Sequence, residues 1–215
     1  MPNSLWTELA AAADVTLSSA QVGQLDAYID RLIERNQVMN LTRITDRADA
    51  EVRHVADALT LLPHLPKAAG RRSLIQIADV GTGGGVPGAI LAIARPDAIV
   101  TLIDATNKKL DAVADICQSV GVKNVRMIHS RAADVRLTFD VVTARAVGAL
   151  QPLVDWCHGL LKPGAVLLAM KGPKAAEELT AAERTIRLRR LSAEVIDVNQ
   201  PALPGHVIVK LTKRH

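Results

Sequence analysis

The feature that most constrains this chain is a glycine-rich segment that follows a short apolar run. Leu74–Val80 is mostly apolar, as expected of a buried strand, and leads into Asp79-Val80-Gly81-Thr82-Gly83-Gly84-Gly85-Val86-Pro87-Gly88. A helix is predicted over Pro87–Ala94, with Pro87 in its first turn, where proline is tolerated. A loop entering a helix presents backbone N–H groups at the helix N-terminus, and glycines let a ligand approach them closely. The segment therefore indicates a ligand-binding loop.

The rest of the chain alternates apolar runs with helical segments, which predicts a parallel sheet with helices on both faces. Residues 1–68 read as helical, with apolar stripes over 18–37 and 49–62. The link 199–205 is too short for a parallel crossover, so the last two strands should form an antiparallel edge pair. Further strands are predicted over 98–103, 125–129, 139–143, 165–171, 191–198 and 206–212, and further helices over 107–120, 150–161 and 174–187.

Two kinds of ligand suit the glycine loop. Gly83–Gly88 matches the dinucleotide fingerprint, which keeps a nicotinamide-dependent dehydrogenase as an alternative. Asp79 opens the motif, however, and its carboxylate would repel a pyrophosphate but can hold the cationic amino-acid end of S-adenosylmethionine. Asp104 ends the next strand, where it can accept both ribose hydroxyls of either cofactor. Residues 129–134, at the end of the third strand, should run alongside the adenine of the cofactor. We therefore expect an S-adenosylmethionine site in the seven-stranded, Rossmann-like α/β sheet of class I methyltransferases.

Composition limits the partners and the compartment. The net charge of +4 and the pI of about 9.3 permit nucleic acid without requiring it, so a non-catalytic RNA-binding module is a further alternative. With four aromatic residues, an array of base-stacking platforms is not expected. Cys117 and Cys157 form no C-x-x-C pair, which argues against zinc and for reduced thiols in the cytoplasm. We see no signal peptide and no membrane-spanning run.

The predicted acceptor side of the sheet lacks a catalytic base. Thr143-Ala144-Arg145-Ala146 follows the fourth strand, where methyltransferases of exocyclic amines commonly have Asp/Asn-Pro-Pro-aromatic. The two cysteines fall in predicted helices, away from this edge. Arg145 and Lys171 are the candidate catalytic residues that remain. Such a site suits an acceptor atom that already has a lone pair, such as N7 of guanine, because catalysis then reduces to positioning.

Several separated motifs resemble the glucose-inhibited division protein B family, the bacterial 16S rRNA guanine-N7 methyltransferases. The likeness runs from about Met39 to Lys171. Asp79–Gly88 matches the family's glycine loop throughout, whereas Ala58 replaces a usual serine and Ala133 a usual glutamate. The other motifs are Asn40-Leu41-Thr42, Arg53-His54-Val55-Ala56-Asp57-Ala58-Leu59, Ser130-Arg131-Ala132, Thr143-Ala144-Arg145-Ala146 and Met170-Lys171-Gly172.

The resemblance implies a guanine in 16S rRNA, or in a precursor of the small ribosomal subunit, as substrate, with S-adenosylmethionine as donor and no metal. Another RNA methyltransferase is the closest alternative. We expect a cytoplasmic monomer without membrane attachment, in which an N-terminal extension (1–68) packs on a methyltransferase core (69–215). The expected cofactor-binding residues are Asp79, Gly81, Thr82, Gly83, Gly85, Val86, Pro87, Gly88, Asp104, Arg131, Ala132, Ala133 and Arg145. The expected RNA-binding residues are Asn40, Arg43, Arg53, His54, Lys108 and Lys171.

Basic residues of the extension suggest how RNA docks. Arginines crowd residues 31–53, and two lysines and an arginine of the core should lie near the same sheet edge. We hypothesise a phosphate-tracking surface there, formed by Arg31, Arg35, Arg43, Arg47, Arg53, Lys108, Lys109 and Arg145.

Overall fold

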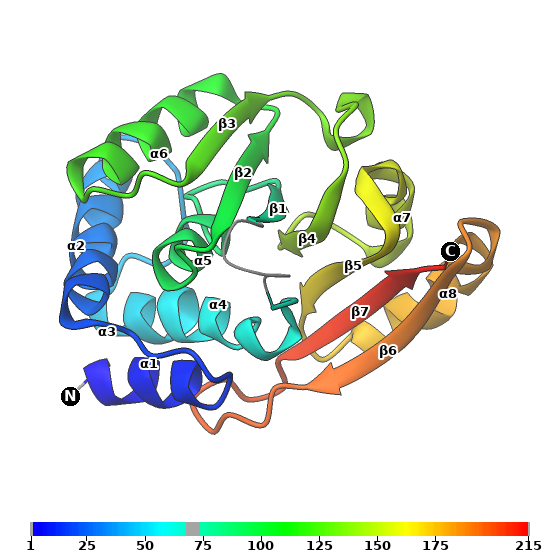
Figure 1. The fold of residues 1–215 in the computed structure, drawn as a ribbon, viewed down its shortest axis with the longest axis horizontal. Coiled ribbons are helices and arrows are strands. Elements are labelled where there is room, and N and C mark those ends of the chain that lie inside the picture. The colour runs from blue at the N-terminus through cyan, green and yellow to red at the C-terminus, as the bar shows by residue number, and fades with distance from the viewer. Residues whose placement is uncertain (1, 68–73, 215) are drawn as a thin grey trace.

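A seven-stranded mixed sheet forms the centre of the molecule (Figure 1), in the order β3-β2-β1-β4-β5-β7-β6. The structure is a computed structural model that describes residues 2–67 and 74–214. β7 runs antiparallel to both of its neighbours, whereas the other pairs are parallel. The expected sheet with an antiparallel edge is therefore confirmed. The strands are β1 (Ile75–Val80), β2 (Ala98–Asp104), β3 (Val125–His129), β4 (Phe139–Arg145), β5 (Leu161–Lys171), β6 (Leu191–Asp197) and β7 (Val207–Lys213).

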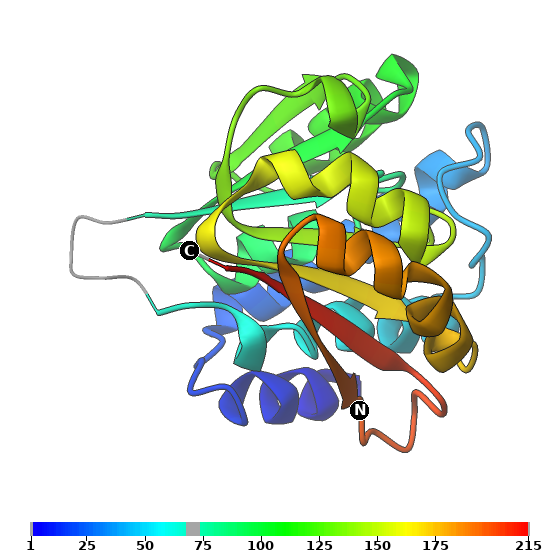
Figure 2. The same cartoon turned by 90° about the vertical axis from the view of Figure 1, so that its right-hand side faces the viewer.

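Helices cover both faces of the sheet (Figure 2). α7 (Leu150–Cys157) and α8 (Ala175–Leu188) pack on one face, and α5 (Gly88–Ala94) and α6 (Asn107–Ser119) pack on the other. Each face has its own apolar cluster, which is aliphatic and alanine-rich. Because β1, β2 and β3 are parallel neighbours, their carboxyl ends and the loops that follow lie at one edge of the sheet.

The N-terminal segment packs on the α5–α6 face. It begins with α1 (Pro2–Ala11), for which no separate helix was predicted within the helical residues 1–68, and continues with α2 (Ser19–Asn36), which was expected. Ser18 caps α2 in a capping box with Gln21. Leu25, Tyr28 and Leu32 of α2 belong to the same apolar cluster as α5 and α6, so the segment shares a core with the sheet.

The predicted helix over 49–62 differs from the structure in kind and in extent. The helical segment starts at α3 (Arg47–Ala50), where the Asp46 side chain accepts a bond from the Asp49 N–H. It then widens into a π-helix, η1 (Glu51–Ala56), and ends with α4 (Asp57–Leu59) and a separate 3₁₀ turn, η2 (Leu62–His64). An apolar stripe marks the buried face of a helix but does not distinguish the α from the π hydrogen-bonding pattern.

The predicted helix over 150–161 is too long. α7 ends at Cys157, a 3₁₀ turn η4 (His158–Leu160) follows, and β5 begins at Leu161 rather than at residue 165. Leu161 pairs with Phe139, and the register then shifts before Val141. Pro163 is tolerated in β5 because it lies at this irregularity, where a missing N–H breaks no regular ladder.

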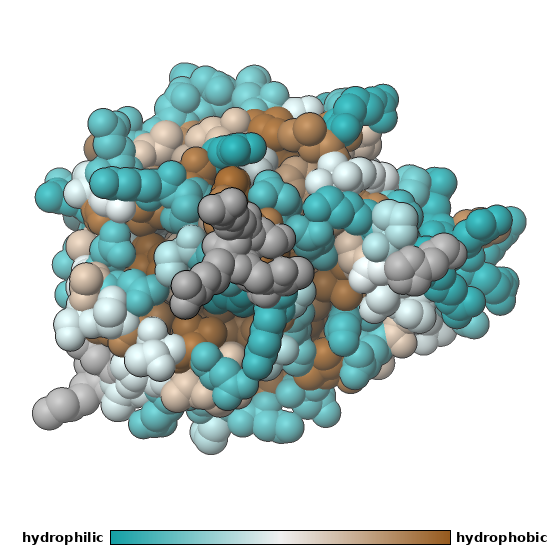
Figure 3. All heavy atoms as spheres, in the orientation of Figure 1, coloured by the Kyte–Doolittle hydropathy of each residue, from teal (hydrophilic) through white to brown (hydrophobic). Residues whose placement is uncertain are grey.

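The surface seen in Figure 3 is mostly hydrophilic, with smaller hydrophobic areas between polar side chains. Among the described residues, no helix is both long and apolar enough to span a bilayer.

Candidate cofactor and acceptor site

Asp79 lies beneath the glycine loop and holds its two ends together. Its Oδ2 accepts hydrogen bonds from Thr82 Oγ1 at 2.6 Å and from the Gly88 N–H at 3.0 Å, and its Oδ1 accepts from Thr143 Oγ1 at 3.0 Å. The side chain is fully buried, and burial raises its pKa to about 6. We expected this carboxylate to face the amino-acid end of a cofactor; it faces the loop's own donors, and therefore shapes the loop from behind.

The loop has a path that only glycines follow easily. Gly81, Gly83 and Gly85 have positive φ angles of 66°, 54° and 79°. A Cβ at Gly85 would lie 2.0 Å from the Tyr28 hydroxyl, and one at Gly88 would lie 2.3 Å from Leu102 Cδ2. The turn thus has no space for side chains at these two positions.

Asp104 joins the glycine loop to the loop after β2. Its Oδ2 accepts from the Gly83 N–H at 3.0 Å, and its Oδ1 accepts from the Thr106 N–H at 2.9 Å. Each oxygen keeps a second lone pair, and the residue lines a pocket at the carboxyl edge of the sheet. The carboxylate is therefore placed to accept further bonds from a pair of hydroxyls.

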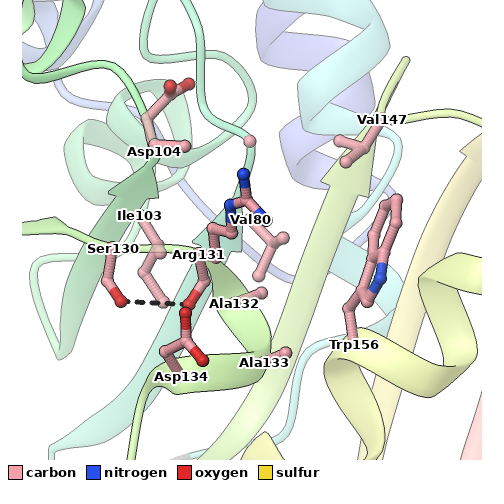
Figure 4. A pocket seen from close by; sticks show the side chains of 12 residues that line it. Val80, Ile103, Asp104, Ser130, Arg131, Ala132, Ala133, Asp134, Val147 and Trp156 are labelled. Carbon is pink, nitrogen blue, oxygen red and sulfur yellow. Dashed lines mark hydrogen bonds between the residues drawn. The ribbon is translucent and has the colours of Figure 1, made fainter.

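The pocket has a volume of about 460 Å³ and lies between the carboxyl ends of β1 and β2, the turn after β3, and Val147 and Trp156, which follow β4 in the chain (Figure 4). Its size and its largely apolar walls are those of a small-molecule site. The size of the pocket, its apolar walls and the carboxylate of Asp104 together fit the nucleoside part of S-adenosylmethionine. The pocket is lined by Val80, Gly81, Ile103, Asp104, Ala105, Ser130, Arg131, Ala132, Ala133, Asp134, Val147 and Trp156.

The pocket includes some of the predicted cofactor residues and adds others. Gly81, Asp104 and the turn Arg131–Ala133 line it as expected. The remaining predicted loop residues are not part of its lining: Asp79, Thr82, Gly83, Gly85, Val86, Pro87 and Gly88. Val147 and Trp156 were missed. Both follow the fourth strand, and this position in the chain could have suggested that they lie near the site. Nothing in the sequence around them indicates a role in binding.

Arg145 connects β4 to the N-terminal segment. Its guanidinium donates to the Arg53 carbonyl at 2.6 Å and to His54 Nδ1 at 2.9 Å, and it forms an ion pair with Asp57 at 3.3 Å. Asp57 also contacts His206 Nδ1, at 3.0 Å. Two of the sequence motifs that stood apart in the chain, and His206 near its end, therefore meet at one place, the carboxyl end of β4.

His54 is a buried, neutral member of this cluster. Burial, and then the positive charge of Arg145, lowers the pKa of His54 to about 3. Because Nδ1 accepts from the guanidinium, the ring proton is on Nε2, which lies 3.0 Å from Thr42 Oγ1 and donates to it. The Thr42 hydroxyl also accepts from the Ile44 N–H. His54 thus joins the loop after α2 to the end of β4, and its side chain is only 2% exposed.

Lys171, at the end of β5, is held by its neighbours. Its Nζ donates to the Gly148 carbonyl at 2.6 Å and to Glu178 Oε2 at 2.7 Å. The same Glu178 oxygen accepts from the Leu150 N–H at 2.8 Å. Lys171 thereby secures the connection between β4 and α7, next to the predicted acceptor site.

The predicted RNA-binding residues fall into two groups. Asn40, Arg43, Arg53 and Lys108 are exposed, as a contact with RNA requires. His54 is instead buried, and Lys171 is partly buried and bound to Glu178, so neither is presented for direct contact with RNA. Arg47, which we included in the phosphate-tracking surface, is instead bound to Asp26, Asp30 and Glu51. Arg31 and Arg35 are likewise paired, with Glu34 and Asp115. Of the arginines in that surface, Arg43 and Arg53 present side chains that no acid of the described chain holds.

Tyr28 is a contact of the loop that the sequence did not reveal. This fully buried side chain of α2 donates from its hydroxyl to the Gly84 carbonyl at 2.9 Å. Its burial raises the tyrosine pKa well above the usual value, so the hydroxyl remains a donor. The N-terminal segment therefore supports the glycine loop directly.

Curated proteins resemble this chain over most of its length. The ribosomal RNA small subunit methyltransferase G of Sorangium cellulosum is 40% identical over 99% of this chain and 88% of its own. The protein of the same name from Yersinia pseudotuberculosis is 36% identical over 94% of this chain and 95% of its own.

Solved structures share the fold at low sequence identity. An S-adenosylmethionine-dependent O-methyltransferase from Thermotoga maritima superposes with a TM-score of 0.58 at 16% identity, over 86% of this chain and 71% of its own. A ribosomal protein L11 methylase from Lactobacillus delbrueckii gives 0.55 at 14% identity, over 76% and 80%. The expected class I methyltransferase fold is confirmed, and the nicotinamide alternative finds no support.

A family model described as GidB, rRNA small subunit methyltransferase G, matches residues 21–202. This range includes the glycine loop, the pocket and the cluster around Arg145. The chain belongs to the GidB family of small-subunit rRNA methyltransferases, as its separated motifs predicted.

Proposed function

We propose that this enzyme methylates N7 of a guanine in 16S rRNA, with S-adenosylmethionine as the donor. The observation that carries the proposal is the lack of a ready nucleophile among the described residues of the site. Cys117 and Cys157 are buried in helices, and burial raises the pKa of each thiol to about 12. Arg145 and Lys171 are cations bonded to acceptors of the fold. An acceptor with its own lone pair needs neither a nucleophile nor a base.

The residues of the pocket have separate tasks in this proposal. Asp104 would accept the ribose hydroxyls, the turn Arg131–Ala133 would border the adenine, and Gly81 and Gly83 would let the ligand approach the backbone. Asp79, Thr82, Gly85, Val86, Pro87 and Gly88 would act by shaping the loop. S-adenosylmethionine supplies a methyl group on a positively charged sulfur.

The acceptor base would be positioned at the carboxyl ends of β4 and β5. Arginine commonly reads guanine through O6 and N7 together, but that pairing would occupy the lone pair that must react. Arg145 and Lys171 would therefore leave N7 free and act on O6, on flanking phosphates, or on the loops that shape the site. Methylation moves positive charge onto the purine, so a cation held away from the ring opposes it least.

The proposed substrate is 16S rRNA or a precursor of the small subunit, bound by exposed residues that include Asn40, Arg43, Arg53 and Lys108. We further propose that the enzyme acts as a monomer in the cytoplasm and needs no metal.

Mass spectrometry of 16S rRNA nucleosides from cells with and without the gene tests the reaction. We expect 7-methylguanosine at one site to disappear in the deletion and to return with the wild-type gene. Single-turnover rates should stay nearly flat from pH 6 to 9, because no proton is removed from N7. A different missing nucleoside, or a rate that rises steeply with pH, would point to another acceptor atom.

A further inference from the structure

Trp156 is an aromatic side chain that the core of the fold does not use. The other three aromatic residues, Trp6, Tyr28 and Phe139, are at most 3% exposed, whereas Trp156 is 40% exposed on α7. An apolar side chain that stays in contact with water does not gain the favourable free energy of burial, and the indole is among the largest apolar side-chain surfaces. The exposed area of Trp156 is therefore available to a ligand.

The indole forms one wall of the pocket that contains Asp104. Figure 4 shows Trp156 and Val147 on one side and the turn Ser130–Asp134 on the other. The opposite wall includes the small side chains of Ala132 and Ala133, where the family pattern has glutamate at the second position. The pocket thus offers a flat aromatic surface across from alanine.

We propose that Trp156 is the surface on which the adenine of the methyl donor stacks. The inference rests on the proposed function, because it assigns a residue of the same donor site. Every base has a π-face, and an aromatic side chain binds it without needing a particular hydrogen bond. Ala133 has no carboxylate with which to bind the adenine ring. Stacking on Trp156 recognises the ring instead.

The geometry favours the donor's base over the acceptor's. Trp156 shares its pocket with Asp104 and Ile103 of β2 and with Ala132 after β3. A ribose on Asp104 places its base in this part of the pocket. The acceptor guanine belongs at the ends of β4 and β5, near Arg145 and Lys171.

The chain's two tryptophans allow a direct spectroscopic test. Trp6 is 1% exposed and donates to the Glu51 carbonyl, so its surroundings do not change when the pocket fills. We expect S-adenosylhomocysteine to change the tryptophan fluorescence of the wild type. In Trp156→Phe the remaining tryptophan emission comes from Trp6, and we expect the same ligand to leave it unchanged.

Calorimetric titration with S-adenosylhomocysteine measures the contribution of stacking. Trp156→Ala should weaken binding by about 5- to 150-fold, the range for loss of one base–aromatic stack, and Trp156→Phe should retain most of the affinity. Leu188→Ala is the control, since Leu188 is 69% exposed on α8 and does not line the pocket.

The outcomes separate this inference from the proposed function. If Trp156→Ala binds as tightly as the wild type while Asp104→Ala binds weakly, the stacking proposal is wrong and the donor site stands. Normal donor affinity with weakened RNA binding would assign the indole to the acceptor base, which also overturns the proposal. A wild type that binds no S-adenosylhomocysteine would refute both.

Discussion

The guanidinium of Arg145 donates to Nδ1 of buried His54 at 2.9 Å, which ties the end of β4 to the N-terminal segment. The same guanidinium reaches the Arg53 carbonyl and Asp57. Lysine has one ammonium in place of a planar fork and cannot serve all three acceptors at once. Arg145→Lys should therefore lower the free energy of unfolding by about 1–3 kcal/mol. Urea denaturation measures this, with exposed Arg136→Lys as the control; equal effects of the two variants would contradict it.

Asp104→Ala should weaken S-adenosylhomocysteine binding by about 1–3 kcal/mol, because a charged acceptor of two hydroxyls is lost. The change also removes the acceptor of the Gly83 N–H, which loosens the loop. Isothermal titration calorimetry checks the affinity. Asp111→Ala removes an acid of α6 outside the pocket and should bind like the wild type. An unchanged affinity in Asp104→Ala would remove this residue from the cofactor site.

Tyr28→Phe leaves the carbonyl of Gly84 without its buried donor. An unsatisfied buried acceptor costs about 1–3 kcal/mol, so the variant should unfold at lower urea concentration. Amide hydrogen exchange over residues 81–88 should also speed up, because the hydroxyl holds this loop against α2. If stability falls but exchange in the loop does not change, Tyr28 supports the helix packing and not the loop.

Asp79 should make stability depend on pH. Its pKa is raised to about 6 by burial, so between pH 4 and 6 the folded state keeps a proton that the unfolded chain releases. Its contribution to stability is therefore present at low pH and is lost as the pH rises through 6. Urea unfolding of wild type and Asp79→Asn at pH 5.0 and 7.5 tests the sign. The wild type should lose stability relative to the variant at the higher pH; a constant difference would show that Asp79 does not titrate in this range.

Arg43 and Arg47 offer a matched pair of charge reversals. Arg43 is exposed, so Arg43→Glu should reduce RNA affinity and flatten its dependence on salt while leaving stability unchanged. Arg47→Glu places a fourth carboxylate among Asp26, Asp30 and Glu51, and should destabilise the fold instead. Thermal unfolding and filter binding at several salt concentrations separate the two effects. A flattened salt dependence in a stable Arg47→Glu would restore it to the phosphate surface.

The sequence predicted the sheet and the glycine loop because both depend on local patterns. Apolar runs define the strands, and the loop is defined by adjacent glycines. The contacts between motifs were not predictable in this way. Arg145 and His54 lie in motifs that were noticed separately, yet nothing in either motif says that they share a hydrogen bond.

Residues whose role depends on the space around them were also missed. Trp156 has no local signature, and only its position beside the turn after β3 makes it part of a pocket. Arg47 looked like a phosphate ligand because the three acids that bind it are spread over two helices. Charge counted along a sequence does not reveal which charges are already neutralised in the fold.

The close approach of Tyr28 to Gly85 has a consequence for evolution. A Cβ at position 85 would overlap the tyrosine hydroxyl at 2.0 Å, so position 85 cannot gain a side chain while Tyr28 is present. We expect related proteins with a side chain at the position of Gly85 to have a smaller residue at the position of Tyr28. Insertions that shift α2 along its axis should be selected against for the same reason, even though the helix contributes no residue to the pocket lining.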